Sequence, residues 1–160
     1  MQDEEQSSSG VRVPPPLVYL AALGAGFLLQ RWLPMPLAGS GTEVAPVRDA
    51  GYLLIVSAIA LAGWAVGTFR QIGTSLNPTK PTSALVISGP YRFTRNPMYL
   101  ALALLHAGIA FAVNMLWPFV MLAPALLVIR YLVIDREESY MAARFGEAYR
   151  DYCRRVRRWL

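Results

Sequence analysis

The chain has 160 residues, of which 55% are hydrophobic and only 16% are charged, and its 15 basic and 10 acidic residues give a formal charge of +5. Soluble domains average about 45–50% apolar and about 25% charged residues, so this composition argues against a soluble enzyme and against disorder. One cysteine and one histidine exclude an intramolecular disulfide framework and do not supply the ligands of a structural zinc site, so no metal is expected.

Uncharged, apolar blocks divide the chain. Residues 51–69 contain no charge over 19 positions, close to the roughly 20 residues that one helix needs to cross a bilayer. Residues 96–129 are uncharged over 34 positions, and a single helix of that length would measure about 50 Å, well beyond a hydrocarbon core of about 30 Å. This block must therefore fold back, and we expect the break at residues 114–118, where Pro118 removes a helical hydrogen-bond donor.

These blocks predict an all-α integral membrane protein with about four transmembrane helices, the last two forming a hairpin. The expected spans are residues 15–33, 51–70, 97–114 and 117–135. A soluble helical bundle is the alternative, but its apolar core would be large for so short a chain. The expected organisation is a disordered N-terminal leader at 1–16, two transmembrane helices within 17–70, and a region over 71–160 that would carry any catalysis.

The basic residues predict the orientation. Residues 70–96, from the end of the second span to the third, contain four basic residues and no acid, and seven arginines follow the fourth span. Because cytoplasmic loops carry the excess of Lys and Arg, both termini are predicted to be cytoplasmic. The leader lacks the basic start of a secretory signal, so the first span is expected to be retained, and the compact size suits a bacterial inner membrane.

Residues 137–159 place apolar side chains at helical spacing, with charged side chains between them. This pattern predicts a C-terminal amphipathic cytoplasmic helix that lies at the membrane surface or caps the bundle. Arginines beside a transmembrane bundle more often meet anionic lipid headgroups than nucleic acid. Membrane lipids are therefore expected partners, and nucleic acid is not.

Candidate catalytic or binding residues are expected within residues 74–99 and at the start of the C-terminal helix. The chain contains no G-x-G-x-x-G or G-x-x-x-x-G-K-[ST] motif and no His–Asp pair beside a nucleophile. Residues 85–99 read LVISGPYRFTRNPMY. Taken alone, this stretch is typical of a connecting loop, with a turn at Gly89-Pro90, Asn96 as N-cap and Pro97 in the first turn of the next helix.

Two motifs in order change that interpretation. They are L-V-x-x-G-P-Y-x-x-x-R-N-P-x-Y over residues 85–99 and E-E-x-x-M-x-x-x-F-G-x-x-Y-x-x-Y over residues 137–152, joined by the hydrophobic hairpin. Together they resemble the isoprenylcysteine carboxyl methyltransferase-like family of integral-membrane methyltransferases and the related phospholipid N-methyltransferases. The resemblance covers residues 85–152, and the helices within residues 15–70 carry no family-specific residue.

The resemblance implies S-adenosylmethionine as methyl donor, bound without a Rossmann domain between the hairpin and the C-terminal helix. The implied cofactor contacts are Ser83, Ala84, Leu85, Val86, Tyr91, Asn96, Pro97, Met98, Tyr99 and Glu137. Chemically, Glu137 can accept from the cofactor's ammonium, and Arg95 or a backbone N–H near Asn96 can take its carboxylate. We therefore expect Arg95 and Glu137 to position the cofactor, because methyl transfer depends mainly on a close, aligned and dry acceptor.

Two positions depart from the family pattern. Asn96 stands where the family often has His, and Asn cannot titrate near neutral pH, so no proton transfer is expected there. Val133 stands where the prenylcysteine enzymes have an Arg, which leaves Arg130 and Arg136 as candidate substrate contacts nearby. The expected acceptor is a lipophilic or amphipathic small molecule or a lipidated group that enters from the bilayer, through a carboxylate, an amine or a thiol.

Two other functions remain open on the sequence alone: a non-catalytic four-helix membrane scaffold, and an NADPH-dependent membrane reductase of the sterol-reductase type. The remaining polar and small residues have structural interpretations. His106 is expected to form a structural hydrogen bond, Cys153 to pack, and Gly63 and Gly67 to form a helix-packing face. The oligomeric state is left open.

Overall fold

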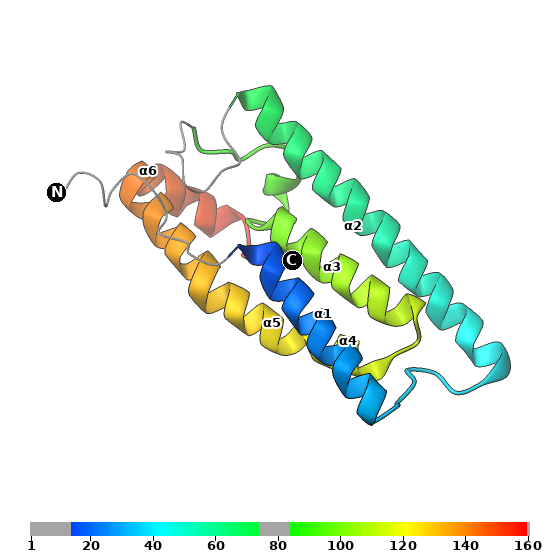
Figure 1. Ribbon diagram of the computed structural model, residues 1–160. Helices are drawn as coiled ribbons and strands as arrows, with labels where there is room; N and C mark the ends of the chain where they lie inside the picture. Colours follow the sequence, from blue (N-terminus) through cyan, green and yellow to red (C-terminus); the bar gives the residue numbers. More distant parts are fainter. Residues whose placement is uncertain (1–13, 74–83, 160) are drawn as a thin grey trace.

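The computed structural model describes residues 14–73 and 84–159, and this part of the chain contains helices, turns and irregular segments without a strand (Figure 1). Residues 1–13 of the expected leader, and Ser83, lie outside the described residues. The helices are α1 (Pro15–Trp32), η1 (Gly41–Glu43), α2 (Val44–Ile72), η2 (Gly89–Arg92), α3 (Pro97–Ala112), α4 (Leu116–Val120), α5 (Leu122–Ile129), the π-helical turn η3 (Arg130–Ile134) and α6 (Asp135–Arg155).

Helix α3 is the central element, because it contacts α1, α2, α4 and α5. Figure 1 shows α3 running between α1 and α2, with α5 on the far side of α1. The most extensive packing joins α2 to α3. There, Gly51 lies so close to the other helix that a Cβ atom would stand 2.4 Å from the backbone nitrogen of Ala112. The absence of a side chain at Gly51 therefore sets the spacing of the two helices.

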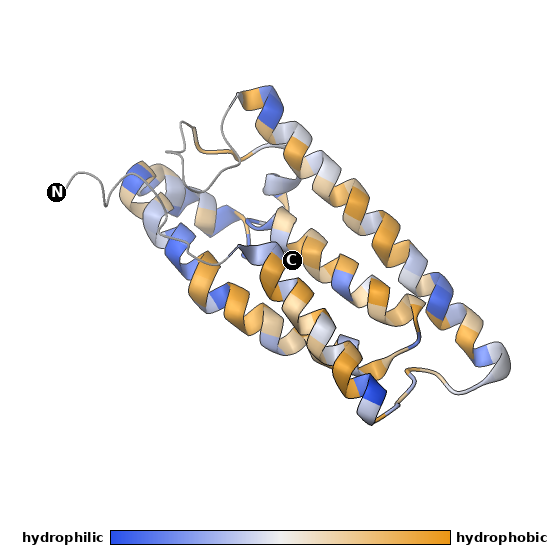
Figure 2. Cartoon of the chain, in the orientation of Figure 1, coloured by the Kyte–Doolittle hydropathy of each residue, from blue (hydrophilic) through white to orange (hydrophobic). Residues whose placement is uncertain are grey.

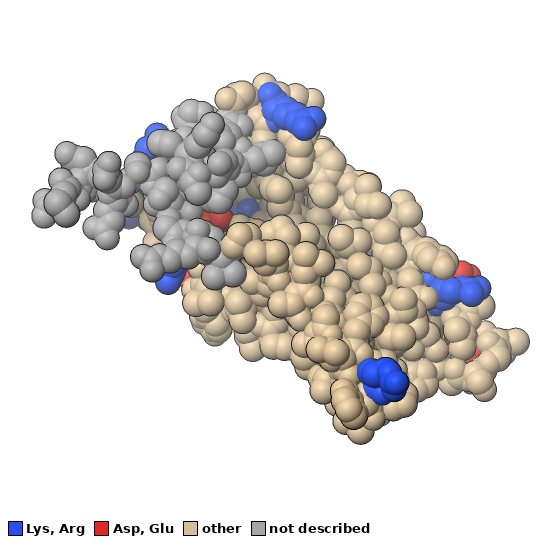
Figure 3. Space-filling model, in the orientation of Figure 1, with Lys and Arg blue, Asp and Glu red and all other residues tan. Residues whose placement is uncertain are grey.

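Within residues 14–73 and 84–159, two helices are long and apolar enough to cross a membrane, Gly41–Ile72 and Leu116–Arg155, and the apolar helix Pro97–Ala112 is shorter. Apolar residues follow the helices over most of their length, and polar residues gather in α6 (Figure 2). On the face shown in Figure 3, charged side chains lie near the ends of the molecule, and the broad band between them is uncharged. The all-helical prediction is confirmed, and α2 begins at Val44, before the expected span at 51–70.

The predicted reversal between the last two apolar helices is present, but Pro118 is not its cause. Asn114 adopts a left-handed conformation, with φ of 54°. Its side chain accepts from the Ala38 N–H at 2.9 Å and donates to the Ala38 carbonyl at 3.2 Å. Pro118 lies inside the first turn of α4, where its missing N–H would have no helical partner. The turn is therefore made by Asn114.

The C-terminal helix departs from the prediction of one helix over 137–159. Helix α6 continues from η3 and is kinked at Gly146, where φ is 53° and ψ is −124°. It ends at Arg155, because Val156 is extended, with φ of −123° and ψ of 128°. The next residues return to the start of α3, where the backbone N–H of Arg95 donates to the Arg157 carbonyl at 3.0 Å.

The glycine contact between α2 and α3 predicts a difference between two conservative substitutions. Gly51→Ala is expected to lower the thermal unfolding temperature in detergent, since relieving the clash costs about 1–3 kcal/mol. Gly63→Ala on the same helix is the matched control. A Cβ atom there meets nothing within 4 Å, and Ala gains helix propensity over Gly. Equal unfolding temperatures for Gly51→Ala and wild type would contradict the close packing.

Candidate functional site

A cavity of about 460 Å³ lies at the end of the bundle where α3 and α6 begin, and α2 forms one side of it. This volume is within the range of small-molecule sites, about 300–1,000 Å³. Every predicted cofactor contact within the described residues lines this cavity, as does Arg95. These contacts are Ala84, Leu85, Val86, Tyr91, Asn96, Pro97, Met98, Tyr99 and Glu137. Residues from two motifs almost 40 positions apart therefore share one wall.

The two arginines predicted to contact a substrate are not brought to this cavity. Arg130 and Arg136 are both exposed, and neither lines it. The Arg130 guanidinium lies over the Tyr131 ring, 5.3 Å from its centroid. Their placement gives no support to the predicted substrate role, because Val133, on the buried face of the same turn, points inward in their place.

The central polar contact of the cavity joins α3 to α6. The Tyr99 hydroxyl donates to the Glu137 carboxylate, with 2.7 Å between the oxygens. The backbone carbonyl of Tyr99 in turn accepts from the Tyr19 hydroxyl of α1 at 3.2 Å. Tyr99 therefore stands at the meeting point of three helices, and its own carboxylate partner faces the cavity.

Glu137 has no cationic partner in the described part of the chain: no arginine or lysine there forms an ion pair with it. Burial raises the pKa of Glu137, and the neighbouring charge of Glu138 adds to the rise, whereas the hydrogen bond from Tyr99 opposes it. A carboxylate in this state gains from any cation that enters the cavity, because charged hydrogen bonds are stronger in a partly dry site.

Tyr91 is fixed from two sides. Its backbone carbonyl accepts from the Tyr152 hydroxyl of α6 at 2.7 Å, and its ring meets Phe69 of α2 edge-on, with centroids 5.3 Å apart. Burial raises the pKa of Tyr91, so its hydroxyl stays protonated at neutral pH. The preceding Gly89 has φ of +57°, and a Cβ atom there would stand 2.3 Å from Thr68 Oγ1. Glycine thus allows the turn to approach α2 and to present Tyr91 to the cavity.

Asn96 occupies the N-cap position of α3 without capping it through its side chain. Its Nδ2 instead donates to the Arg158 carbonyl at 3.0 Å, and Thr94 Oγ1 donates to the same carbonyl at 3.1 Å. The prediction of Asn96 as the N-cap residue is therefore confirmed, although its side chain makes its hydrogen bond elsewhere. The buried amide is satisfied by the chain that follows α6, which was beyond the reach of a local sequence pattern.

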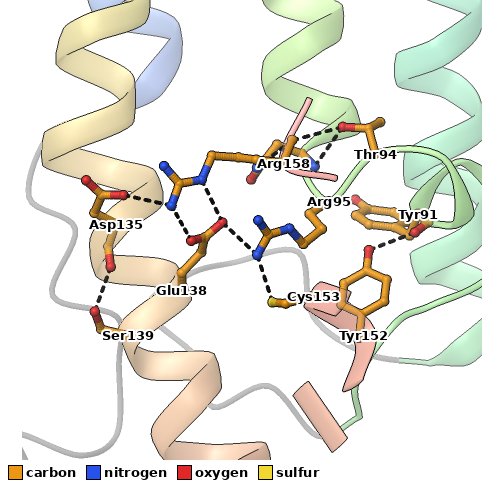
Figure 4. A network of polar contacts seen from close by, with 10 residues as sticks. Tyr91, Thr94, Arg95, Asp135, Glu138, Ser139, Tyr152, Cys153 and Arg158 are labelled. Carbon is orange, nitrogen blue, oxygen red and sulfur yellow. Dashed lines mark hydrogen bonds and ion pairs between the residues drawn. The ribbon is translucent and has the colours of Figure 1, made fainter. Parts of the chain in front are cut away.

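Arg95 enters an ionic network beside the cavity (Figure 4). Its Nη1 lies 3.2 Å from Glu138 Oε1 and donates to Cys153 Sγ at 2.7 Å. Glu138 is also held by Arg158, through Nη2 at 2.6 Å and Nε at 3.1 Å. The carboxylate of Glu138 is consequently shared between two guanidinium groups, and Cys153 has the packing role expected for it.

The apolar residues that line the cavity were not predicted from the sequence. Ala58, Ile59 and Ala62 of α2 face Leu102 and Leu105 of α3 there. Their spacing of three and four residues marks helix faces, but it did not indicate which faces would line a cavity. Tyr149 and Tyr152 also line it, and their place in the F-G-x-x-Y-x-x-Y motif was the available signal.

The other residues singled out by the sequence lie apart from the cavity. His106 Nε2 lies 2.7 Å from the Pro118 carbonyl oxygen, as expected for a structural hydrogen bond between α3 and α4. A Cβ atom at Gly63 or at Gly67 would meet nothing within 4 Å. Their small-residue pair therefore does not pack helices together within the described residues.

The comparisons with known proteins agree with this arrangement. The sequence model of the phospholipid methyltransferase family matches residues 47–148. A stretch of 35 residues is 51% identical to an uncharacterized protein from Haemophilus influenzae and covers 22% of this chain and 56% of that relative. The match thus spans little more than half of the relative's length. No solved structure matches the chain. The chain belongs to the phospholipid methyltransferase family, a family of methyltransferases.

The unpaired carboxylate of Glu137 predicts an unusual stability effect. Because its pKa is raised in the folded protein, the wild type loses stability as pH rises through the interval between the ordinary and the raised pKa. Glu137→Gln removes that loss. The variant is therefore expected to match or exceed the wild type in thermal unfolding temperature at about pH 8, with a smaller difference at about pH 5.

Glu147→Gln is the matched control for this measurement, since Glu147 is exposed and forms ion pairs with Arg150 and Arg154. Its loss should change the unfolding temperature only slightly, because solvent screens exposed ion pairs and they contribute little to stability. A clear drop in the unfolding temperature of Glu137→Gln at about pH 8 would show that the carboxylate stabilises the unliganded protein.

Proposed function

We propose that this protein transfers a methyl group from S-adenosylmethionine to a lipophilic or amphipathic acceptor at a membrane. The observation that carries the proposal is the half-buried carboxylate of Glu137, which has no cationic partner among the described residues and faces a cavity lined by every described residue of the predicted cofactor set. The membership of a methyltransferase family supports the same reaction class.

The cavity residues fit the charges of this cofactor. Glu137 would accept from the ammonium group, which supplies the cation that the carboxylate lacks. Arg95, which also lines the cavity, would pair with the carboxylate group. Tyr91 and Tyr99 would offer ring faces to the adenine or to the sulfonium. The bound cofactor supplies an activated methyl group, and these residues hold it in place without a general base.

The apolar side of the cavity would receive the acceptor. Ala58, Ile59 and Ala62 form one wall and Leu102 and Leu105 the other, so a hydrocarbon chain could lie between α2 and α3 with its polar end near Tyr99. Such a fit orients the acceptor and keeps water from the reacting atoms. A carboxylate, an amine or a thiol could serve as the polar end.

In the proposed topology, four helical segments cross the membrane: α1, α2, α3 and the run from α4 to η3. The loop at the cavity and the helix α6 then lie on the cytoplasmic side together with both termini, as the distribution of basic residues favours. We place the protein in a bacterial inner membrane. The cavity would open where the apolar helices meet the headgroup region.

Binding of the cofactor tests the proposal directly. We expect isothermal titration of the detergent-purified protein with S-adenosylmethionine to show binding that is at least about tenfold weaker in Glu137→Gln, since the variant loses a charge-assisted hydrogen bond. Glu147→Gln, which changes an exposed acid on the same helix, is expected to bind like the wild type.

Two results would contradict parts of this proposal. A folded wild type that fails to bind in two detergents and in nanodiscs would remove the methyltransferase function and favour a scaffold. Equal binding by wild type and Glu137→Gln would retain the cofactor and remove Glu137 from its site.

The acceptor class is tested with radiolabelled cofactor and three lipophilic acceptors, each compared with a water-soluble counterpart. Phosphatidylethanolamine in nanodiscs, N-acetyl-S-farnesylcysteine and a long-chain alkyl thiol present an amine, a carboxylate and a thiol on an apolar chain. We expect transfer to at least one of them and far less to its water-soluble counterpart, because the apolar wall binds the chain. Comparable transfer to ethanolamine, N-acetylcysteine or mercaptoethanol would contradict a lipophilic acceptor, and transfer to none would contradict all three classes.

A further inference from the structure

The four residues Val156–Trp159, which follow α6, run across the outer side of the cavity wall. Their backbone carbonyls accept three hydrogen bonds from the start of α3: the Arg95 N–H at 3.0 Å donates to Arg157, and Thr94 Oγ1 and Asn96 Nδ2 donate to Arg158. These contacts satisfy groups that are almost fully buried, with Thr94 2% and Asn96 8% exposed. The backbone of this segment therefore anchors the loop before α3.

The side chain of Arg158 has a separate role from its backbone. Its guanidinium holds Glu138 through two nitrogens, at 2.6 Å and 3.1 Å, and lies 3.2 Å from Asp135 Oδ1. Glu138 in turn faces Arg95 at 3.2 Å. Figure 4 shows the Glu138 carboxylate between the two guanidinium groups. The side chains of Glu138 and Arg95 are 18% and 15% exposed, so solvent screens their interaction only in part.

The network holds two positive charges, Arg95 and Arg158, and two negative charges, Glu138 and Asp135, so its net charge is zero, but only Glu138 lies against Arg95. Glu138 carries one negative charge and is shared by two arginines, so Arg95 is only partly neutralised. Asp135 is more exposed, at 40% of its side chain, and acts on the outer side of Arg158. Without the Arg158 side chain, the Glu138 carboxylate would pair with Arg95 alone. The wall at Arg95 would then lose most of its positive potential.

The cavity is consequently lined by two opposite charges: Glu137, which has no cationic partner among the described residues, and Arg95, which shares its only carboxylate partner with Arg158. An amino-acid group, with its ammonium and carboxylate a few bonds apart, matches that arrangement. We propose that Arg158 is a positioning residue which shares the Glu138 carboxylate with Arg95, so that Arg95 is not fully neutralised and can receive the carboxylate of the cofactor's amino-acid group. The proposal rests on the proposed function, since it assumes S-adenosylmethionine in this cavity.

The test compares two ligands that differ only in that carboxylate, S-adenosylmethionine and decarboxylated S-adenosylmethionine. Titration calorimetry on the full chain is expected to show that Arg158→Met binds the first about tenfold more weakly than wild type and binds the second unchanged. Arg154→Met is the matched control, because it removes an exposed arginine of α6 that pairs with Glu147 and Asp151. It should bind both ligands like the wild type.

A second comparison tests whether Arg158 acts through Glu138. In Glu138→Gln, no carboxylate remains to neutralise Arg95, so S-adenosylmethionine should bind at least as well as to the wild type. Adding Arg158→Met to that background should then have no further effect. The double variant removes the Glu138 carboxylate together with the guanidinium that holds it, so this comparison stands even where Arg158→Met alone does not fold.

Each outcome decides between the claims. If Arg158→Met weakens both ligands equally, or if the double variant binds more weakly than Glu138→Gln, Arg158 acts structurally or directly and the inference is overturned, whereas the proposed function stands. If the folded wild type binds neither ligand, the proposed function fails and takes the inference with it. The inference is supported if Arg158→Met weakens the binding of S-adenosylmethionine alone, and if this effect disappears in the Glu138→Gln background.

Discussion

The hydrogen bond from Tyr99 to Glu137 is the contact around which the cavity is built. It joins the first turn of α3 to the first turn of α6, and the same tyrosine is tied to α1 through its carbonyl. A buried carboxylate with one hydrogen bond and no ion pair is costly to hold. The helices must therefore be fixed by other means, and close packing between α2 and α3 at Gly51 supplies part of that rigidity.

The two consecutive acids of α6, Glu137 and Glu138, differ in their ion pairs. Glu137 is left without a cation, whereas its neighbour Glu138 is held by two arginines. Adjacent positions on a helix point in different directions, so one acid faces the cavity and the other closes its edge. This division explains why two consecutive acids can have different roles: one is available to a ligand, and the other organises the surrounding cations.

Much of this arrangement could be predicted from the sequence, because apolar blocks and two local motifs carry it. The helical hairpin followed from the apolar blocks, and the residues that line the cavity are those that the family resemblance of the two motifs implied. The partner of Asn96 could not be predicted, since its side chain bonds to Arg158, 62 positions away. The same holds for Ala58 and Ile59, whose role depends on which face of α2 packs against α3. Arg130 and Arg136 do not line the cavity, because proximity in sequence does not fix the direction in which a helical side chain points.

The length of α3 has a consequence for where the chemistry would occur. Its 16 residues span about 24 Å, less than the roughly 30 Å of a hydrocarbon core. In the proposed topology, a helix this short ends below the headgroups on one side unless the bilayer thins around it. Because Pro97 and Tyr99 begin α3, the polar end of the cavity would then lie at the boundary between acyl chains and headgroups. An acceptor anchored by its own hydrocarbon chain presents its polar group at that depth, so the protein would need to orient it and not to extract it from the membrane.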